Sequence, residues 1–329
     1  MRSSAVQLRP IPSALAVAAL FAATACSSST SLQPEVFTHP QGTILDSVPV
    51  AARPFGLAVS VNGVAYVARL DAESLGRADL PSRVVAPAAE VGATPSHVTF
   101  DPTGATAYSS NQGSHTISVV DVATNTQTDS VPVSSDAWNV IVSPNGTRLY
   151  ATTDQGALFV VNTATNTVVK SLVLTAGDAL RGLAMDRTGR WLYVGGCLTG
   201  SVYVIDAETN TLARTLPVGG LPQHMAVSHD GTQLYVADET RGLKIVTVET
   251  GALRPITLAG GGYGLALSPD DAQLYVSIPA AGLVQVVDRA TGSVLQTLPV
   301  SGRPRGIAFT HSGAYAVIAN ESGWVTFVR

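Results

Sequence analysis

The stretch SPNGTRLYA at residues 143–151 recurs as DRTGRWLYV at 186–194, SHDGTQLYV at 228–236 and SPDDAQLYV at 268–276. Weaker copies extend the series to seven. The repeated tyrosine position falls at Tyr66, Tyr108, Tyr150, Tyr193, Tyr235, Tyr275 and Val317. Successive copies are 40 to 43 residues apart, a period typical of architectures in which each structural unit packs against the next. The seven copies fill most of the chain.

Each unit is predicted to form four strands. In the third copy, an inner strand at 140–143 leads through Pro-Asn-Gly into a second strand at 149–153. A third strand follows at 157–162 and an outer strand at 168–174. The glycine supplies the positive φ that tight hairpin turns need. The third strand tends to end on a short polar residue that can cap its own turn, as at Asp121, Asn162, Asp206 and Asp288.

The two ends of the repeat array complement each other. The last copy ends at Arg329, one strand short of a full unit. GTILDSVPVAARPFGLAV from Gly42 matches GSVLQTLPVSGRPRGIAF from Gly292, so residues 43–50 are predicted to supply the missing outer strand. A ring closed in this way leaves no open sheet edge. The sequence therefore predicts an all-β protein, a closed seven-bladed β-propeller over residues 43–329.

Composition agrees with such a fold and limits the partners. Of the 329 residues, 46% are hydrophobic, 13% are charged and 30 are glycine, which suits many short buried strands joined by turns. Without residues 1–25 the chain has 17 basic and 23 acidic residues, a net charge of −6. Because nucleic-acid-binding domains are typically basic, the sequence disfavours a nucleic-acid partner.

The first 25 residues have the pattern of an export signal. Arg2 and Arg9 precede an apolar run at 11–22 that is too short to span a bilayer. Ala-Thr-Ala-Cys at 23–26 resembles a bacterial lipobox, although Ala23 stands where leucine is usual; plain signal cleavage and secretion is the alternative. We expect Cys26 to be lipidated and 26–42 to form the anchor and its polar tether. This predicts an exported monomer that meets the membrane only through its lipid, in the outer membrane facing the periplasm.

The repeats resemble the YVTN repeat of bacterial and archaeal propellers, a group that includes lactonase-like and YncE-like lipoproteins. The resemblance rests on YSSN at 108–111, VIAN at 317–320 and VIDAETNTLARTLPVG at 204–219. It covers residues 43–329, with a departure at 71–85, where DAESLGRADLPSRVV lacks the usual third-strand pattern. The resemblance implies a seven-bladed fold and leaves the activity open, since such propellers include binding modules, lactonases and dehydrogenases.

Alignment of the repeats places seven residues at equivalent points around one mouth of the channel. We call them the ring positions: Phe55, Ser96, Trp138, Arg181, Gln223, Tyr263 and Arg305. They precede the inner strands, on the face formed by the outer-to-inner and second-to-third connections, which we call the channel-mouth face. The other connections add Arg69, Asp71, Asn111, Asp154, Cys197, Asp238, Glu239 and Glu321. Aromatic walls with a few convergent polar groups are typical of small-ligand pockets.

Arg181 and Arg305 come from blades three apart, so we expect them to face each other across the mouth. There they would bind a carboxylate or phosphate through paired hydrogen bonds. The alternative is that both arginines are neutralised by acidic residues of the same face: Asp154, Asp238, Glu239 and Glu321. His97 and His224 are also three blades apart. We expect them to be too far apart to share a metal ion, and to serve as wall residues or as a general acid or base.

For the remaining candidate residues, the sequence favours a structural role over a catalytic or ligand-binding one. Trp138 and Tyr263 are interpreted as stacked lids on the channel, with cofactor platforms as the alternative. Cys197 is interpreted as a semi-buried inert thiol rather than a reactive one, because no flanking cation in the sequence would lower its pKa. The sequence contains no phosphate-binding loop, no Cys-x-x-Cys-His haem site and no Gly-x-Ser-x-Gly elbow. It predicts no cofactor, and nothing in it supports a metal ion.

Three functions remain open, and the sequence favours binding over catalysis. The first is a scaffold of the cell envelope that binds a small ligand or an envelope protein on the channel-mouth face. Its ligand site is predicted to consist of Phe55, His97, Trp138, Arg181, His224, Tyr263 and Arg305. The second is an enzyme of the lactonase or dehydrogenase type, and the third a single-stranded nucleic-acid binder with aromatics beside arginine.

Overall fold

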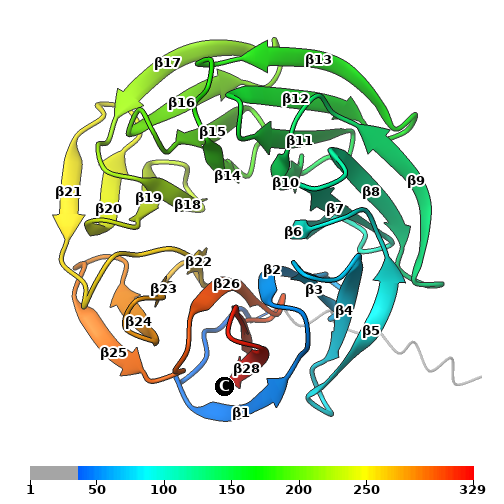
Figure 1. Ribbon diagram of the computed structural model, residues 1–329. Helices are drawn as coiled ribbons and strands as arrows, with labels where there is room; N and C mark the ends of the chain where they lie inside the picture. Colours follow the sequence, from blue (N-terminus) through cyan, green and yellow to red (C-terminus); the bar gives the residue numbers. More distant parts are fainter. Residues whose placement is uncertain (1–35) are drawn as a thin grey trace, which may run out of the picture. The chain divides into compact units, whose positions relative to one another are not determined.

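The computed structural model describes residues 36–329, which form a ring of seven four-stranded antiparallel sheets (Figure 1). In each sheet, or blade, the strands follow one another from the centre of the ring outward. Blade 1 comprises β2 (Pro54–Val59), β3 (Ala65–Arg69), β4 (Ser74–Asp79) and β5 (Val84–Glu90). Blade 2 comprises β6 (Pro95–Phe100), β7 (Thr106–Asn111), β8 (Thr116–Asp121) and β9 (Thr126–Pro132). Blade 3 comprises β10 (Ala137–Val142), β11 (Arg148–Thr153), β12 (Ala157–Asn162) and β13 (Thr167–Val173).

The other blades repeat this order. Blade 4 comprises β14 (Leu180–Met185), β15 (Trp191–Gly196), β16 (Ser201–Asp206) and β17 (Thr211–Pro217). Blade 5 comprises β18 (Pro222–Val227), β19 (Gln233–Asp238), β20 (Gly242–Thr247) and β21 (Leu253–Ile256). Blade 6 comprises β22 (Leu265–Leu267), β23 (Gln273–Ile278), β24 (Leu283–Asp288) and β25 (Val294–Leu298). No helix within residues 36–329 has the length and apolarity to cross a membrane.

Blade 7 is built from both ends of the folded chain. It comprises β26 (Pro304–Phe309), β27 (Ala316–Asn320), β28 (Trp324–Val328) and β1 (Ile44–Pro49). The backbone N–H of Thr43 donates to the carbonyl of Arg329 at 2.7 Å, and the reciprocal bond measures 2.8 Å. At the other end, the N–H of Val50 donates to the carbonyl of Gly323 at 2.9 Å. The prediction that residues 43–50 close the ring is confirmed.

The repeated tyrosines form the contacts between blades. Tyr66, Tyr150, Tyr193, Tyr235 and Tyr275 rank among the largest fully buried side chains. In one apolar cluster, Tyr150 and Leu158 of blade 3 pack against Leu180 and Leu192 of blade 4. The outer strands are mostly exposed instead, which matches their more polar sequences. The repeated positions therefore stabilise the ring. Residues that bind a ligand or act in catalysis are expected in the connections between the strands.

The turns have the conformations that their sequences predict. Gly146 has a φ of +72° and donates its N–H to the carbonyl of Ser143 at 2.8 Å. At the end of the third strand of blade 2, Asp121 Oδ1 accepts bonds from the N–H and hydroxyl of Thr124, both at 2.7 Å. Asn162, Asp206 and Asp288 also accept backbone N–H groups of their own turns. Both kinds of turn lie on one side of the ring, which we call the hairpin-turn face.

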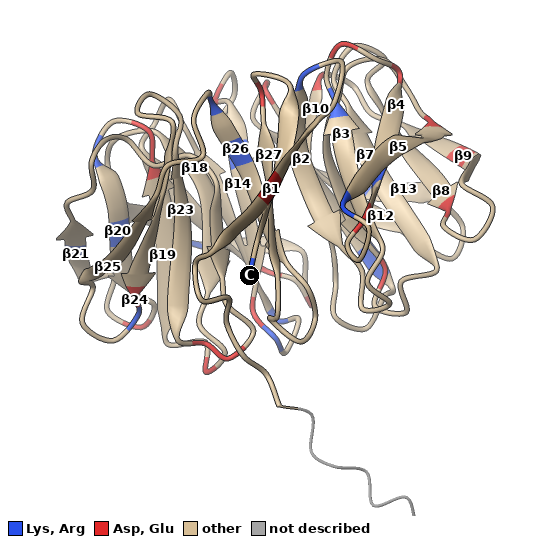
Figure 2. Ribbon diagram, turned by 90° about the horizontal axis from the view of Figure 1, so that it is seen from below, with Lys and Arg blue, Asp and Glu red and all other residues tan. Residues whose placement is uncertain are grey.

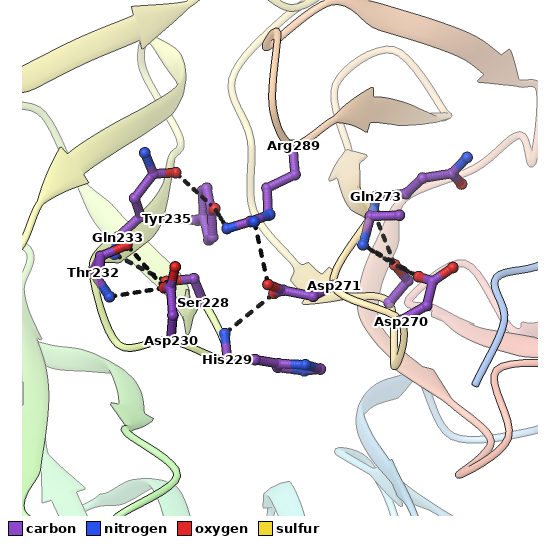
Figure 3. A network of polar contacts seen from close by, with 12 residues as sticks. Ser228, His229, Asp230, Thr232, Gln233, Tyr235, Asp270, Asp271, Gln273 and Arg289 are labelled. Carbon is purple, nitrogen blue, oxygen red and sulfur yellow. Dashed lines mark hydrogen bonds and ion pairs between the residues drawn. The ribbon is translucent and has the colours of Figure 1, made fainter. Parts of the chain in front are cut away.

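Asp271 departs from this turn pattern and joins two blades. It has a φ of +62°, at the position where the other six first hairpins carry glycine. Its carboxylate accepts the N–H of His229 from blade 5 at 3.2 Å and pairs with Arg289 at 3.4 Å (Figure 3). Because a non-glycine residue is strained at positive φ, these two contacts are the compensation that the structure offers.

Part of the expected tether is held on the hairpin-turn face (Figure 2). The N–H of Thr38 donates to the carbonyl of Ser312 at 2.9 Å, and His39 Nδ1 lies 2.5 Å from the carboxylate of Asp270. The hydroxyl of Tyr275 donates to the carbonyl of Pro40 at 3.1 Å. Residues 38–42 therefore belong to the folded body rather than to the tether. The predicted signal segment 1–25, Cys26 and residues 27–35 lie outside the described residues.

Candidate functional site

A cavity of about 520 Å³ opens on the channel-mouth face. Six of the seven ring positions line it: Phe55, Trp138, Arg181, Gln223, Tyr263 and Arg305. The seventh, Ser96, is fully buried, and its hydroxyl donates to the carbonyl of Trp138 at 2.6 Å. Charged lining residues from the connections are Arg53, Asp71, Glu239 and Glu321. Most of the ring positions therefore line one cavity, whose volume is in the range of small-molecule sites.

The residues that follow the ring positions determine how closely the inner strands approach. They are Gly56, His97, Asn139, Gly182, His224, Gly264 and Gly306. Asn139 Nδ2 donates to the carbonyl of Arg181 in the next blade at 2.9 Å, and His97 Nδ1 lies 2.8 Å from the carbonyl of Trp138. A Cβ added to Gly264 would lie only 1.9 Å from the carbonyl oxygen of Arg305. Glycine at four of these positions thus lets neighbouring backbones touch.

We expect Gly264→Ala to lower the free energy of unfolding by about 2 to 3 kcal/mol, because the new methyl group forces blades 6 and 7 apart. Gly195→Ala is the matched control, since a Cβ there meets its nearest neighbours at 3.4 Å, an ordinary contact distance. Urea unfolding followed by circular dichroism measures both. Equal midpoints for the two variants would show that the inner strands are not in close contact.

Arg305 is neutralised within the pocket wall. Its Nε and Nη2 each lie 2.7 Å from Glu321 Oε2, and Nη1 lies 3.9 Å from Glu239. Arg53 binds the other oxygen of Glu321. Burial alone would raise the pKa of Glu321, but the hydrogen bonds from Arg53 and Arg305 outweigh it and hold this pKa below its usual value. The structure therefore supports the alternative in which acidic residues of the same face neutralise Arg305.

Arg181 has a different environment from Arg305. Its guanidinium stacks on the ring of Trp138, 3.5 Å from the centroid. Within residues 36–329 it forms no ion pair, and none of its N–H groups donates a hydrogen bond. Stacking fixes the plane of the guanidinium and leaves its edge free. Arg181 thus carries the uncompensated positive charge of the pocket.

Gln223 and Tyr263 add polar atoms without partners to the same wall. Gln223 is only 5% exposed; its Nε2 donates to Glu239 Oε2 at 2.7 Å, but no donor in the described residues reaches its Oε1. The hydroxyl of Tyr263 forms no hydrogen bond within residues 36–329. Burial raises the pKa of this hydroxyl, so it stays protonated. The pocket therefore offers the N–H groups of Arg181 and the hydroxyl of Tyr263 to a ligand, whereas Gln223 Oε1 is covered by protein atoms.

The expectation that His97 and His224 lie far apart is wrong. Their Nε2 atoms are 3.0 Å apart, and one imidazole donates to the other. Burial lowers the pKa of His97 to about 3, assisted by the charges of His224 and Arg181, and that of His224 to about 4, assisted by Arg305. With Nδ1 of His97 donating to a carbonyl, its Nε2 is the acceptor and His224 the donor. Both rings are neutral at pH 7 and connect blades 2 and 5.

Cys197 and Asp238 have structural roles. The thiol of Cys197 lies 2.8 Å from the carbonyl of Pro222, and burial raises its pKa to about 12. Asp238 is fully buried, accepts the N–H groups of Leu221 and Thr240, and forms an ion pair with buried Lys244. No group of three or more histidine, cysteine or acidic side chains with metal-site geometry occurs among residues 36–329.

Of the charged residues that line the pocket, one, Arg53, was missed by the sequence analysis. It occupies the position before Pro54 that Arg303 occupies before Pro304, in the two stretches that close the ring. Both arginines contact Glu321. The repeated Arg-Pro pair was therefore the available signal for this cluster.

Comparisons with known proteins give the family. The model of the YNCE-like beta-propeller matches residues 44–259. The uncharacterized protein YwhL of Bacillus subtilis (strain 168) is 32% identical over 134 residues, which are 40% of this chain and 29% of YwhL. Antigen Lp49 of Leptospira interrogans serogroup Icterohaemorrhagiae serovar copenhageni (strain Fiocruz L1-130) is 25% identical over 156 residues, 41% of this chain and 34% of the antigen. The matches thus span about a third of these curated relatives.

Two solved structures share the fold at low sequence identity. A chain of Kuenenia stuttgartiensis hydrazine synthase superposes with a TM-score of 0.77 at 18% identity, covering 89% of this chain and 99% of that one. A chain of a mitotic checkpoint complex superposes with a TM-score of 0.78 at 16% identity, covering 95% and 98%. These likenesses show the propeller architecture alone. With its repeats, its closure and the family match in agreement, the chain belongs to the YNCE-like β-propeller family.

Proposed function

We propose that this chain is a non-catalytic binding protein of the cell envelope, whose channel-mouth pocket holds a small ligand with a negatively charged group. The observation that carries the proposal is the unpaired guanidinium of Arg181, held flat on Trp138 at the edge of a 520 Å³ cavity. Arg305 and Arg53 in the same cavity are already bound to Glu321. A planar guanidinium with free N–H groups binds a carboxylate or phosphate through two parallel hydrogen bonds.

Binding is favoured over catalysis by the protonation states in the pocket. The raised pKa values of the Cys197 thiol and the Tyr263 hydroxyl keep both groups protonated at neutral pH, and a protonated group is neither a base nor a strong nucleophile. A lactonase or dehydrogenase would need an activated group at this place. The faces of Trp138 and Tyr263 are occupied by arginine side chains, which disfavours the stacking of single-stranded bases.

We also propose an orientation for the protein at the membrane. The folded part begins at Val36 on the hairpin-turn face, where Thr38 and His39 are bound. With a lipid on Cys26 in the outer membrane, residues 27–35 would span at most ~30 Å. The hairpin-turn face would then lie toward the membrane, and the channel-mouth pocket would open into the periplasm. Labelling of Cys26 with palmitate in cells, and its loss in Cys26→Ser, tests the anchor.

Arg181→Ala is expected to weaken binding of succinate, propionate or inorganic phosphate at least tenfold, because a paired ionic contact is lost. Isothermal titration measures the affinity, after thermal-shift screening has selected the probe that binds. Arg190→Ala is the matched control. Arg190, like Arg181, stacks on a tryptophan, in this case Trp191, but it lies outside the pocket. Equal loss in both variants, or no binding of any acid from the screen or of the amino acids tested below, would reject the proposal.

A further inference from the structure

The charges of the pocket wall are balanced before any ligand enters. Three arginines and three acidic residues line the cavity: Arg53, Arg181, Arg305, Asp71, Glu239 and Glu321. The Arg53 guanidinium joins Asp71 to Glu321, and Arg305 also binds Glu321. Arg181 is left with its positive charge uncompensated. Because the six charges sum to zero, one acidic group of the pocket must also lack a close partner.

Glu239 holds this surplus of negative charge. Its side chain is 41% exposed, and the distance from its Oε1 to Arg305 Nη1 is 3.9 Å, at the limit of an ion pair. Its other oxygen accepts a hydrogen bond from Gln223. Beside it, the buried Oε1 of Gln223 has no donor. That oxygen is covered by protein atoms, so the accessible group is the half-exposed Glu239 carboxylate, and a carboxylate with only a weak cationic partner is a site for a positively charged hydrogen-bond donor.

The positive and negative subsites belong to neighbouring blades. Arg181 is the ring residue of β14, Gln223 is the ring residue of β18, and Glu239 follows β19. The inner strands of blades 4 and 5 are in contact, since a Cβ on Gly182 would lie 2.7 Å from the carbonyl oxygen of Gln223. Arg181, Glu239 and Tyr263 all line the same cavity. Both subsites therefore open into one cavity.

We propose that the ligand is a small zwitterion of the amino-acid type, whose carboxylate binds Arg181 and whose ammonium group binds Glu239, the carboxylate that Gln223 holds in place. This inference rests on the proposed function and specifies its ligand. A simple anion satisfies Arg181 but leaves the half-exposed carboxylate of Glu239 with only its weak contact to Arg305. A zwitterion satisfies both subsites and preserves the neutrality of the wall. The apolar lining of Phe55, Leu198 and Leu221 accepts the carbon skeleton.

The test compares amino acids with their analogues that lack the amino group. The probes are alanine and propionate, 4-aminobutyrate and butyrate, 6-aminohexanoate and hexanoate, and phenylalanine and 3-phenylpropionate. Titration calorimetry with the purified residues 26–329 measures each affinity. We expect at least one amino acid to bind tenfold more tightly than its partner acid, and the spacing in the best pair to report the separation of the two subsites.

Two variants assign the ammonium subsite. Gln223→Leu is expected to reduce the tenfold preference for the amino acid to threefold or less, while binding of the matching acid stays within twofold of wild type. Gln155→Leu is the control, because Gln155 is an exposed residue of the same face outside the cavity. Thermal unfolding of each variant confirms that it is folded. A Gln223→Leu variant that does not fold is replaced by Glu239→Gln, for which the same loss of preference is expected.

The outcomes separate the two proposals. Equal binding of amino acids and their partner acids, with loss of both in Arg181→Ala, overturns the zwitterion and retains the anion site. An amino-acid preference that persists in Gln223→Leu and in Glu239→Gln overturns the assignment of the ammonium subsite. If neither class of compound binds, the proposed function itself is rejected.

Discussion

A chain that begins at residue 52 is expected to lose at least about 4 kcal/mol of its free energy of unfolding relative to a chain that begins at Val36. The deletion removes β1, whose register with β28 extends from the Ile44–Val328 pair to the Pro49–Trp324 pair. It removes the buried side chain of Val50 and the partly buried side chains of Ile44 and Val48 from the apolar clusters of blade 7, where full burial of one such side chain contributes about 1.5 to 3 kcal/mol. It also leaves β28 as an unpaired edge that invites association between molecules.

A chain that begins at Thr43 is the control for this truncation. It keeps β1 but lacks the contacts of Thr38, His39 and Pro40 on the hairpin-turn face, so we expect a loss of about 1 kcal/mol. Urea unfolding measures stability, and size-exclusion chromatography detects association through the exposed edge. If the chain from residue 52 unfolds at the same urea concentration as the chain from Val36, closure by β1 does not stabilise the ring.

The closure could be predicted from the sequence because a propeller is a one-dimensional repeat bent into a circle. Once the period of 40 to 43 residues is known, the missing outer strand of the last copy and the surplus strand before Pro54 must pair. The same regularity places the ring positions, since residues at equal points in the repeat lie at equal depth in the channel. Even blade 1, whose sequence departs from the pattern at 71–85, forms four regular strands.

The distances across the channel could not be predicted in this way, as the two histidines illustrate. Their angular separation suggested that His97 and His224 stand on opposite walls, yet their Nε2 atoms are 3.0 Å apart. The repeat specifies where each blade lies but not how far its side chains extend toward the axis. Glycine at Gly56, Gly182 and Gly264 was the available signal, since it narrows the inner ring and leaves room for two imidazoles.

The different environments of Arg181 and Arg305 could not be predicted from the sequence either. Both occupy ring positions, and the alignment treats them alike. Their environments differ because Glu321, in the connection from β27 to β28, reaches Arg305, whereas Arg181 lies on Trp138 of the preceding blade. Such pairings depend on side-chain rotamers and on residues that vary between copies. Sequence reasoning can therefore propose the members of the pocket, and the structure is needed to show which charges are free.

The buried histidine pair is expected to make the protein about 4 kcal/mol less stable at pH 5 than at pH 7.5. Burial holds the pKa of His97 at about 3 and that of His224 at about 4 in the folded state, against about 6.5 in the unfolded chain. Between these values the unfolded state binds more protons, so the free energy of unfolding falls as the pH falls. Each histidine contributes about 2 kcal/mol over this range. Carboxylates whose pKa is lowered in the folded state change the stability mainly below this pH range.

A double variant tests whether the two histidines cause this pH dependence. His97→Asn copies Asn139, whose amide donates to the next blade, and His224→Gly copies the glycine of four other blades. We expect the variant to lose most of the difference in stability between pH 7.5 and pH 5, whatever its absolute stability. His115→Gln, at an exposed histidine paired with Asp136, is the control. Urea unfolding at each pH measures the slope; a double variant with the wild-type slope would show that other groups take up the protons, and that the 3.0 Å contact between the imidazoles has no part in the acid response.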